Sequence, residues 1–222
     1  GMRAVGSAFL FDGQTGALKF KIPNPEPDEN DQFGSSVAGV GNRIVVGAEG
    51  DDDDDRDFFG LGAGSIYVFD RNNGDLLLSI TNPNPASSNA GDAFGQAVVE
   101  VDGNILASAP STSHNGIFNA GVAYLISPIT GGVILEVPNS DPNPQEIFGH
   151  GIAGLGGNIL GGSIFDDVTS DDDNSGRVFL IDGSTGDVLE EFVNPQPEGL
   201  SELADWFGFS VASAGDKVGS LR

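Results

Sequence analysis

Four copies of one short sequence pattern constrain this chain more than any other feature. A glycine followed by a run of apolar and small residues recurs at 6–12, 64–70, 121–127 and 176–182. A Phe-Gly pair keeps step with that run, at 33–34, 94–95, 148–149 and 207–208. Self-similarity at a period of about 57 residues is typical of solenoids, propellers and arrays, whose units bury their apolar faces against one another. The chain is therefore expected to fold as a series of similar units.

Each repeat contains four short segments with strand character. In the second repeat they are 65–69, 76–80, 96–100 and 104–108, rich in β-branched and aromatic residues and separated by Asn-Gly or Asp-Gly turns. No segment of ten or more residues keeps a 3.6-residue apolar period without interruption by Gly or Pro. The sequence therefore predicts an all-β fold.

A four-stranded antiparallel unit repeated radially is a β-propeller blade. The chain opens with the two outer strands of a blade and closes with two inner strands, so these halves would join and leave no unpaired edge. We expect one domain of about four blades, with a split closing blade. The blades are expected at approximately 33–80, 94–137, 148–193, and 207–222 plus 5–22. A piece of a longer propeller is the alternative, because 217–221 is a poorer strand than 43–47.

The chain is strongly acidic, with 9 basic and 33 acidic residues and a net charge of −24. Such a surface repels nucleic acid and anionic membranes, and it favours cations or a basic partner. An adaptation to salty water is the other reading. No apolar run is long enough for a membrane span, so no membrane insertion is expected. The absence of cysteine excludes disulfides and thiolate chemistry, which fits a bacterial protein on either side of the membrane.

Aspartates concentrate in two loops at the same place in two repeats. Calcium takes six to eight oxygen ligands from carboxylates, carbonyls and amides on flexible loops. We therefore predict Ca²⁺ as a candidate cofactor, with solvated acidic loops as the alternative. The candidate ligands are Asp51, Asp53, Asp55 and Asp57 in the first loop and Asp166, Asp167, Asp171, Asp172 and Asp173 in the second.

Several other residues recur in register. An acidic residue lies two positions before each Phe-Gly pair and is expected to cap the turn into the innermost strand, at Asp31, Asp92, Glu146 and Asp205. The phenylalanines of these pairs are expected to wedge between blades. Trp206, the only tryptophan, is expected to pack at the ring closure; an exposed tryptophan would instead indicate a carbohydrate or protein contact.

Residues for catalysis are few. The two histidines, His114 and His150, fall in different parts of the repeat, and His150 is expected to face the central channel. No Gly-x-Ser-x-Gly elbow, His-Glu-x-x-His motif or Walker loop is present. We expect no enzymatic activity and assign no catalytic residue.

The recurring segments resemble FG-GAP repeats, the blade motif of integrin α-subunit propellers and many bacterial surface proteins. Residues 33–38 and 207–212 match the Phe-Gly half of the motif, and 45–48 and 107–110 match the Gly-Ala-Pro half. The resemblance implies a propeller, with more blades in a complete integrin-type ring than four. The family's Asp-x-Asp-x-Asp-Gly calcium loop is missing, because tight turns such as 39–42 and 101–104 replace it.

Together these observations favour a non-catalytic binding or adhesion module that recognises a protein or glycan through propeller loops. We expect an extracellular, periplasmic or cell-surface location in a bacterium. The alternatives are a fragment or subunit of a larger propeller with an assembly role, or an accessory domain of a hydrolase. A monomer and a ring-completing homo-oligomer both remain open.

Overall fold

The structure is a computed structural model that describes residues 4–51, 62–85, 91–167, 174–196, 205–215 and 217–221. The prediction of an all-β chain is confirmed, because these residues form sixteen strands and no helix. The strands are β1 (Ser7–Phe11), β2 (Leu18–Pro23), β3 (Ser36–Val40), β4 (Arg43–Ala48), β5 (Ser65–Asp70), β6 (Leu76–Thr81), β7 (Val98–Val101), β8 (Asn104–Ala109), β9 (Val122–Ile126), β10 (Val133–Pro138), β11 (Phe148–Leu155), β12 (Asn158–Ser163), β13 (Arg177–Ile181), β14 (Val188–Val193), β15 (Ser210–Ala214) and β16 (Lys217–Leu221). Within the described ranges, no helix is present that could cross a membrane.

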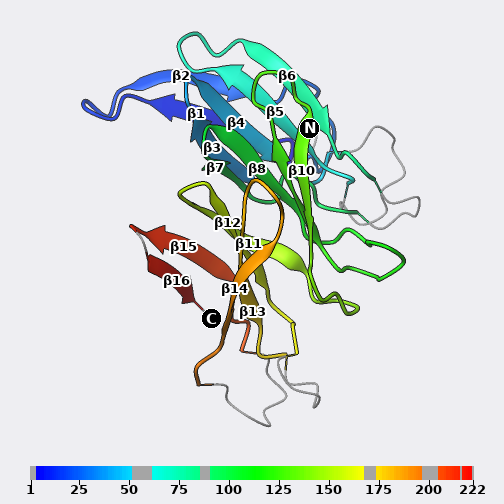
Figure 1. The fold of residues 1–222 in the computed structure, drawn as a ribbon. Helices are drawn as coiled ribbons and strands as arrows, with labels where there is room; N and C mark the ends of the chain where they lie inside the picture. Colours follow the sequence, from blue (N-terminus) through cyan, green and yellow to red (C-terminus); the bar gives the residue numbers. More distant parts are fainter. Residues whose placement is uncertain are drawn as a thin grey trace.

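Three of the sheets are complete antiparallel blades of four strands. Blade 1 is β3–β6, blade 2 is β7–β10 and blade 3 is β11–β14, each with its strands in chain order. The sheets follow one another around an arc (Figure 1), and successive innermost strands, β3, β7, β11 and β15, contact each other. This radial arrangement of four-stranded sheets is that of propeller blades.

The remaining strands form two half-blades. The N-terminal half-blade is β1–β2 and the C-terminal half-blade is β15–β16, and they are separate two-stranded sheets at different ends of the arc (Figure 1). The sequence predicted that these halves join into a closing fourth blade; in the described structure they do not. In β15 only Val211 is buried, whereas Phe207 and Val218 of the same half-blade are partly buried against blade 3. The single-domain assignment remains a prediction.

The outer hairpin of each blade is set by an aspartate turn in three of the four repeats. Asp12 Oδ1 accepts hydrogen bonds from the backbone N–H groups of Gln14 and Thr15. Asp182 Oδ1 accepts the equivalent pair in blade 3. These bonds hold a tight turn that ends at a glycine with positive φ, such as Gly16 at 71°. In blade 2 the Ser127 hydroxyl takes the place of the aspartate.

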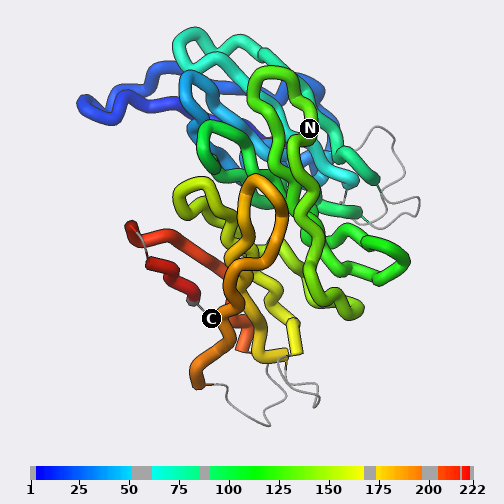
Figure 2. Tube along the Cα trace, viewed as in Figure 1, coloured from blue at the N-terminus to red at the C-terminus, as the bar shows by residue number. Residues whose placement is uncertain are grey.

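The apolar core lies between neighbouring sheets rather than within any one of them. Four clusters of buried side chains lie along the arc, one at each junction of successive sheets. The Cα trace in Figure 2 follows the chain from sheet to sheet along this arc. Phe33, Phe94 and Phe148 are 2%, 0% and 0% exposed, which confirms that these phenylalanines are wedges between blades. Each half-blade also shares one of these clusters with the blade beside it.

A glycine lets each Phe-Gly pair approach the preceding sheet. Gly64, at the start of β5, forms a parallel bridge with Phe94, and Gly6 forms the same bridge with Phe33. A Cβ atom on Gly64 would overlap the backbone of Phe94, and φ at Gly64 is +85°. The recurring glycine is therefore needed for the contact between blades.

Candidate functional site

Four aromatic rings gather where the chain enters β11 and β15. The rings of Trp206 and Phe209 are nearly parallel, with centroids 5.8 Å apart and an interplanar angle of 15°. Phe165 meets Trp206 edge-on at 6.1 Å, and the ring of His150 lies 4.3 Å from that of Phe209. Trp206 and Phe209 are 44% and 43% exposed. We call these four residues the aromatic surface.

A left-handed backbone conformation at Trp206 shapes this surface. The residue before the Phe-Gly pair adopts it in all four repeats, with φ of 55° at Gln32, 57° at Ala93, 55° at Ile147 and 53° at Trp206. The Phe209 N–H donates to the Trp206 carbonyl at 2.9 Å and closes a tight turn. Phe207 then packs against the core between the C-terminal half-blade and blade 3, while Trp206 stays on the surface.

His150 links the aromatic surface to blade 3. Its Nδ1 atom lies 3.0 Å from the carbonyl oxygen of Phe209. This contact joins β11 to the turn that enters β15, so the rings of the surface are held by two neighbouring sheets. His150, on the innermost strand β11, therefore contacts the C-terminal half-blade. Its expected position facing the central channel stays a prediction.

The exposure of Trp206 differs from the closure packing expected for it. In the described structure the two half-blades are separate sheets, and the Trp206 side chain is 44% exposed. An exposed cluster of large rings on a folded protein marks an interaction surface, and tryptophan combines a large apolar face with one N–H donor. Sequence analysis singled out Trp206 and His150 but missed Phe165 and Phe209, because Phe165 has no aromatic counterpart in the other repeats and the residue after the Phe-Gly pair is Ser35, Gln96, His150 or Phe209, with no constant type.

A second recurring feature is a buried pair of an asparagine side chain and a carboxylate. The asparagine Nδ2 donates to the carboxylate in all four repeats: Asn24 to Asp31 at 2.6 Å, Asn82 to Asp92 at 2.9 Å, Asn139 to Glu146 at 2.6 Å and Asn194 to Asp205 at 2.7 Å. Each asparagine Oδ1 accepts a backbone N–H two residues on. The pair thereby fixes the loop that carries the chain from one blade to the next.

The contacts of Glu146 show how the carboxylate of such a pair obtains its hydrogen bonds. Its carboxylate accepts hydrogen bonds from the Asn139 side chain and from both the backbone and the side chain of Asn143. Burial nevertheless raises the pKa of Glu146 above its ordinary value, because these donors only partly replace water. Asp31 likewise accepts the N–H of Asp28. The predicted role of these acids as turn caps is confirmed for Asp31 and Glu146.

The first acidic loop is described only at Asp51; Asp53, Asp55 and Asp57 lie outside the described residues. The buried hydroxyl of Tyr67 donates to Asp51 Oδ2. Burial, together with this carboxylate, raises the pKa of Tyr67 far above its ordinary value. Asp51 thus already has a protein partner.

The second acidic loop is described at Asp166 and Asp167. Asp166 is 2% exposed and its Oδ1 lies 3.0 Å from the Arg177 guanidinium. Burial raises the pKa of Asp166 to about 7, against the opposing effect of Arg177. Asp167 accepts the backbone N–H of Asn174. Arg177, which also pairs with Glu191 at 3.2 Å, was missed by the sequence analysis because only this repeat has an arginine at that position.

The described candidate ligands do not form a metal centre. Asp51 and Asp166 belong to blades 1 and 3, and no group of three or more His, Asp or Glu side chains suited to a metal occurs among the residues that the structure describes. Asp171, Asp172 and Asp173 lie outside those residues. Calcium at the two loops therefore remains a prediction.

The two histidines lie apart from any nucleophile in the described contacts. His114 Nδ1 is 3.4 Å from Glu136 Oε1 in blade 2, and His150 belongs to the aromatic surface.

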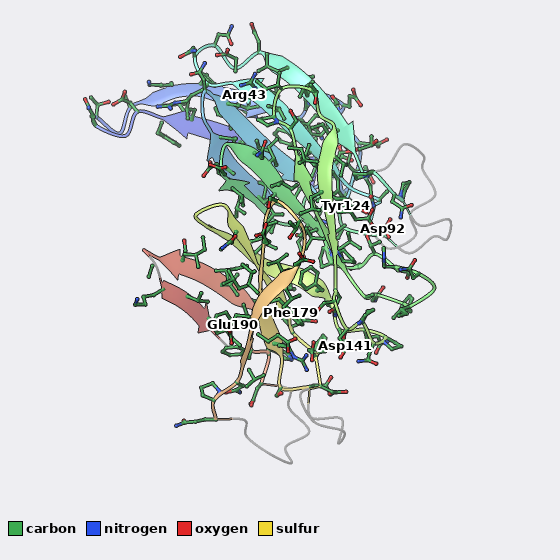
Figure 3. The ribbon with its side chains drawn as sticks, viewed as in Figure 1. Arg43, Asp92, Tyr124, Asp141, Phe179 and Glu190 are labelled. Carbon is green, nitrogen blue, oxygen red and sulfur yellow. The ribbon has the colours of Figure 1, made fainter. Side chains whose placement is uncertain are left out.

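Between blades 2 and 3 a cleft of about 250 Å³ is lined by residues that include Asp102, Asn158 and Asp182. In blade 2 the hydroxyl of Tyr124 is buried, and burial with the nearby charges of Glu136 and Asp92 raises its pKa (Figure 3).

Residues 21–69 match the FG-GAP repeat family. The match extends from β2 through β3 and β4 into β5, so it includes the Phe33-Gly34 pair and the first acidic loop. No curated protein sequence shows significant similarity to the chain. The resemblance to FG-GAP repeats is thus confirmed, while a bacterial origin stays a prediction.

Proposed function

Because the chain carries an FG-GAP repeat on a fold of propeller blades, we propose that it is a non-catalytic binding module that holds a neutral glycan on its aromatic surface. The observation that carries this proposal is the exposed, nearly parallel pair of Trp206 and Phe209. The apolar C–H face of a pyranose ring stacks on such a flat aromatic face. Binding residues of this kind typically lie on loops held by a rigid scaffold.

The size of the surface favours a saccharide over a folded protein. A stable protein interface buries about 800 Å² on each partner, whereas four side chains at one end of two strands match one or two sugar rings. The charge of −24 disfavours acidic polysaccharides, because a like-charged ligand is repelled. A neutral glycan therefore fits both the shape and the charge.

FG-GAP repeats are commonly found in extracellular or surface proteins and are typically non-catalytic. On that basis we place the module outside the cytoplasm, in the periplasm, at the cell surface or secreted, in a bacterium.

The test is a screen of neutral oligosaccharides that follows the fluorescence of Trp206, the only tryptophan in the chain. A ligand that stacks on the indole changes its emission directly. Trp206→Ala should weaken binding of that ligand roughly tenfold, read by calorimetry. Phe118→Ala is the matched control, since Phe118 is 49% exposed and lies outside the aromatic surface.

Two results would contradict the proposal. One is the absence of binding by any neutral glycan together with binding of a protein ligand. The other is a glycan whose affinity is equal for the wild type and Trp206→Ala. Either result would place ligand recognition elsewhere on the loops.

We also propose that Ca²⁺ binds the acidic loops. The support is their aspartate content; the contrary consideration is that Arg177 already neutralises Asp166 in the second loop. A calorimetric titration with Ca²⁺ should show heat in the wild type and less heat in the variant that combines Asp53→Asn with Asp55→Asn, because that variant keeps only the second loop. No heat and no rise in melting temperature would remove calcium from the proposal.

A further inference from the structure

The cleft between blades 2 and 3 combines a buried apolar part with an acidic rim. Val101 and Leu125, which belong to the core between these blades, are the buried apolar part of its lining. The rim consists of residues from three tight turns, the β7–β8, β11–β12 and β13–β14 turns. Its polar side chains are those of Asp102, Asn104, Asn158, Asp182 and Ser184, so two of them are carboxylates and none is basic.

We propose that this cleft binds an alkyl cation, with its ammonium or guanidinium group between Asp102 and Asp182 and its stem against Val101 and Leu125. Hydrogen bonds between a cationic group and a carboxylate are stronger than neutral ones, and long cationic side chains bury their stems on apolar surface while the charged end stays in water. The volume of about 250 Å³ is roughly eight times that of one water molecule in the liquid, enough for such a stem and its charged end.

Both carboxylates are available to a ligand. Asp182 Oδ1 accepts hydrogen bonds from the hydroxyl and N–H of Ser184 and from the N–H of Thr185, which leaves Oδ2 outside the turn contacts. These bonds hold the pKa of Asp182 below its ordinary value, so its carboxylate stays charged at neutral pH. The Asp102 side chain is exposed. Among the described residues, neither aspartate forms an ion pair with a basic side chain.

The acidic pair is particular to this junction. The turns at the junction of blades 1 and 2 have the same strand register, so their residues can be compared directly. Asp102, Asp182 and Asn104 correspond there to Gly41, Ser127 and Arg43. That junction therefore carries a basic residue and neither carboxylate, whereas the cleft carries both carboxylates and no basic residue. A cation supplied by a ligand fits the second arrangement and not the first.

The lining favours an organic cation over a metal ion. Calcium takes six to eight oxygen ligands from flexible loops, whereas Asp102 and Asp182 lie on tight turns of different blades, beside buried apolar side chains. The net charge of −24 draws cations to the whole surface of the protein. The apolar part of the lining gives this cleft a preference for cations that carry a hydrocarbon stem.

The first experiment titrates the unmodified chain with n-butylammonium chloride at constant ionic strength and follows its amides by NMR. We expect saturating shifts at Gly157 and Gly183 and at the side-chain amides of Asn104 and Asn158. Half-saturation should fall in the millimolar range, because exposed ion pairs are weak. n-Butanol, which has a hydroxyl on the same stem, should bind about tenfold more weakly.

Two results of this titration would overturn the proposal. One is a set of small shifts at acidic turns over the whole molecule without saturation at the cleft, which would indicate attraction by net charge alone. The other is equal binding of n-butylammonium and n-butanol, which would show that the carboxylates contribute nothing. The readout comes from the cleft and not from Trp206, so failure here and failure of the glycan screen are distinguishable.

The second experiment removes the charges one at a time. Asp182→Asn keeps an oxygen for the turn, and Asp102→Asn places at φ +46° a residue that tolerates this conformation. Each variant should bind n-butylammonium about threefold more weakly, and the double variant about tenfold. Asp70→Asn is the matched control, because Asp70 begins the same kind of turn in blade 1, outside the cleft. An equal loss in the control would overturn the assignment to these two aspartates.

The third experiment supplies a cation from the chain itself. Asn104→Arg introduces the residue that blade 1 has at the equivalent position and should abolish binding of n-butylammonium. Asn104→Gln, which adds length without charge, should keep most of it. Retained binding in Asn104→Arg would overturn the placement of the ligand. Circular dichroism verifies that each variant is folded, and the titration of the unmodified chain decides the matter if one is not.

The source of the cation is tested with a blocked amino acid. N-acetyl-lysine N-methylamide carries the n-butylammonium stem within a peptide unit. Shifts at the same cleft residues with this probe would identify a lysine side chain of a protein as a ligand, whereas shifts with the free amine alone would identify a small amine. Blocked arginine is the third probe and reports on a guanidinium. Binding of none of the three would overturn the proposal.

Discussion

The left-handed backbone conformation at Trp206 contributes to the arrangement of the aromatic surface. The residue before each Phe-Gly pair has positive φ, although none of the four is Gly, Asn or Asp. Left-handed backbone costs an ordinary L-residue about 1–2 kcal/mol, and this cost is offset by the phenylalanine that the turn places in the core. At Trp206 the same turn leaves the indole on the surface. The conformation alone does not decide exposure, because Ala93 has a similar φ and is 5% exposed, whereas Trp206 is 44% exposed.

The cost of this conformation can be measured at Ile147, the β-branched member of the four. Ile147→Asn should raise the free energy of unfolding by about 1 kcal/mol, because asparagine tolerates the left-handed region. Urea denaturation at neutral pH measures the change. Ile129→Asn is the control, since Ile129 is a 66% exposed turn residue without positive φ. A lower stability for Ile147→Asn than for the control would show that apolar contacts of Ile147 outweigh the strain.

The buried carboxylate of Glu146 should make stability depend on pH. Its pKa is raised in the folded state, so the folded chain binds more protons than the unfolded chain above pH 4.5. Stability therefore falls as pH rises from about 4.5 through the folded pKa. Urea midpoints measured from pH 4.5 to 8 should decline less steeply for Glu146→Gln than for the wild type.

The overall negative charge produces a slope of the same sign, so this test needs a charge-matched control. Glu190→Gln removes one exposed carboxylate of blade 3 (Figure 3) and leaves Glu146 in place. Identical pH profiles for the two variants would show that burial of Glu146 does not set the slope, which net charge and the raised pKa of Asp166 would then produce.

At the scale of the strand, the contact between blades depends on the glycine that precedes the third strand. Gly64→Ala both strains a residue at φ +85° and drives a methyl group into the Phe94 backbone. Gly103→Ala imposes a similar strain at φ +76° in open space. We expect Gly103→Ala to cost about 1–2 kcal/mol and Gly64→Ala to cost roughly 2 kcal/mol more, or to prevent folding. Equal losses in thermal or urea unfolding would contradict the close approach seen here.

Periodic sequence patterns made the strands and turns predictable, whereas contacts between residues far apart in the sequence could not be predicted. The Asp12 and Asp182 turns and the Phe-Gly wedges are local devices repeated in register, so the sequence indicated each blade. The separation of β1 from β16 depends on the angle accumulated over three blades, which no local pattern encodes. The aromatic surface brings Phe165 and His150 of blade 3 together with Trp206 and Phe209 of the next unit. Of these four residues, the sequence singled out only Trp206, as the one tryptophan, and His150, as one of two histidines.

At the scale of the molecule, the arc is a linear series of sheets joined by four cores. In such arrays stability is approximately the sum of the contributions of each unit and of its contacts with its neighbours. A complete blade within the series has a core on each side, whereas each half-blade has one. Stability should therefore be lowest at the ends of the arc, and lowest of all at β15, where four of five residues are exposed.

Hydrogen exchange can map this gradient along the chain. Amides of β8 and β9, whose residues are nearly all buried, should exchange slowest, and amides of β15 and β16 should exchange fastest, because local opening follows local contact. Mass spectrometry of peptides measures this difference along the chain. Uniform protection along the chain would contradict the gradient, because it would mean that the ends of the arc open no more readily than its middle.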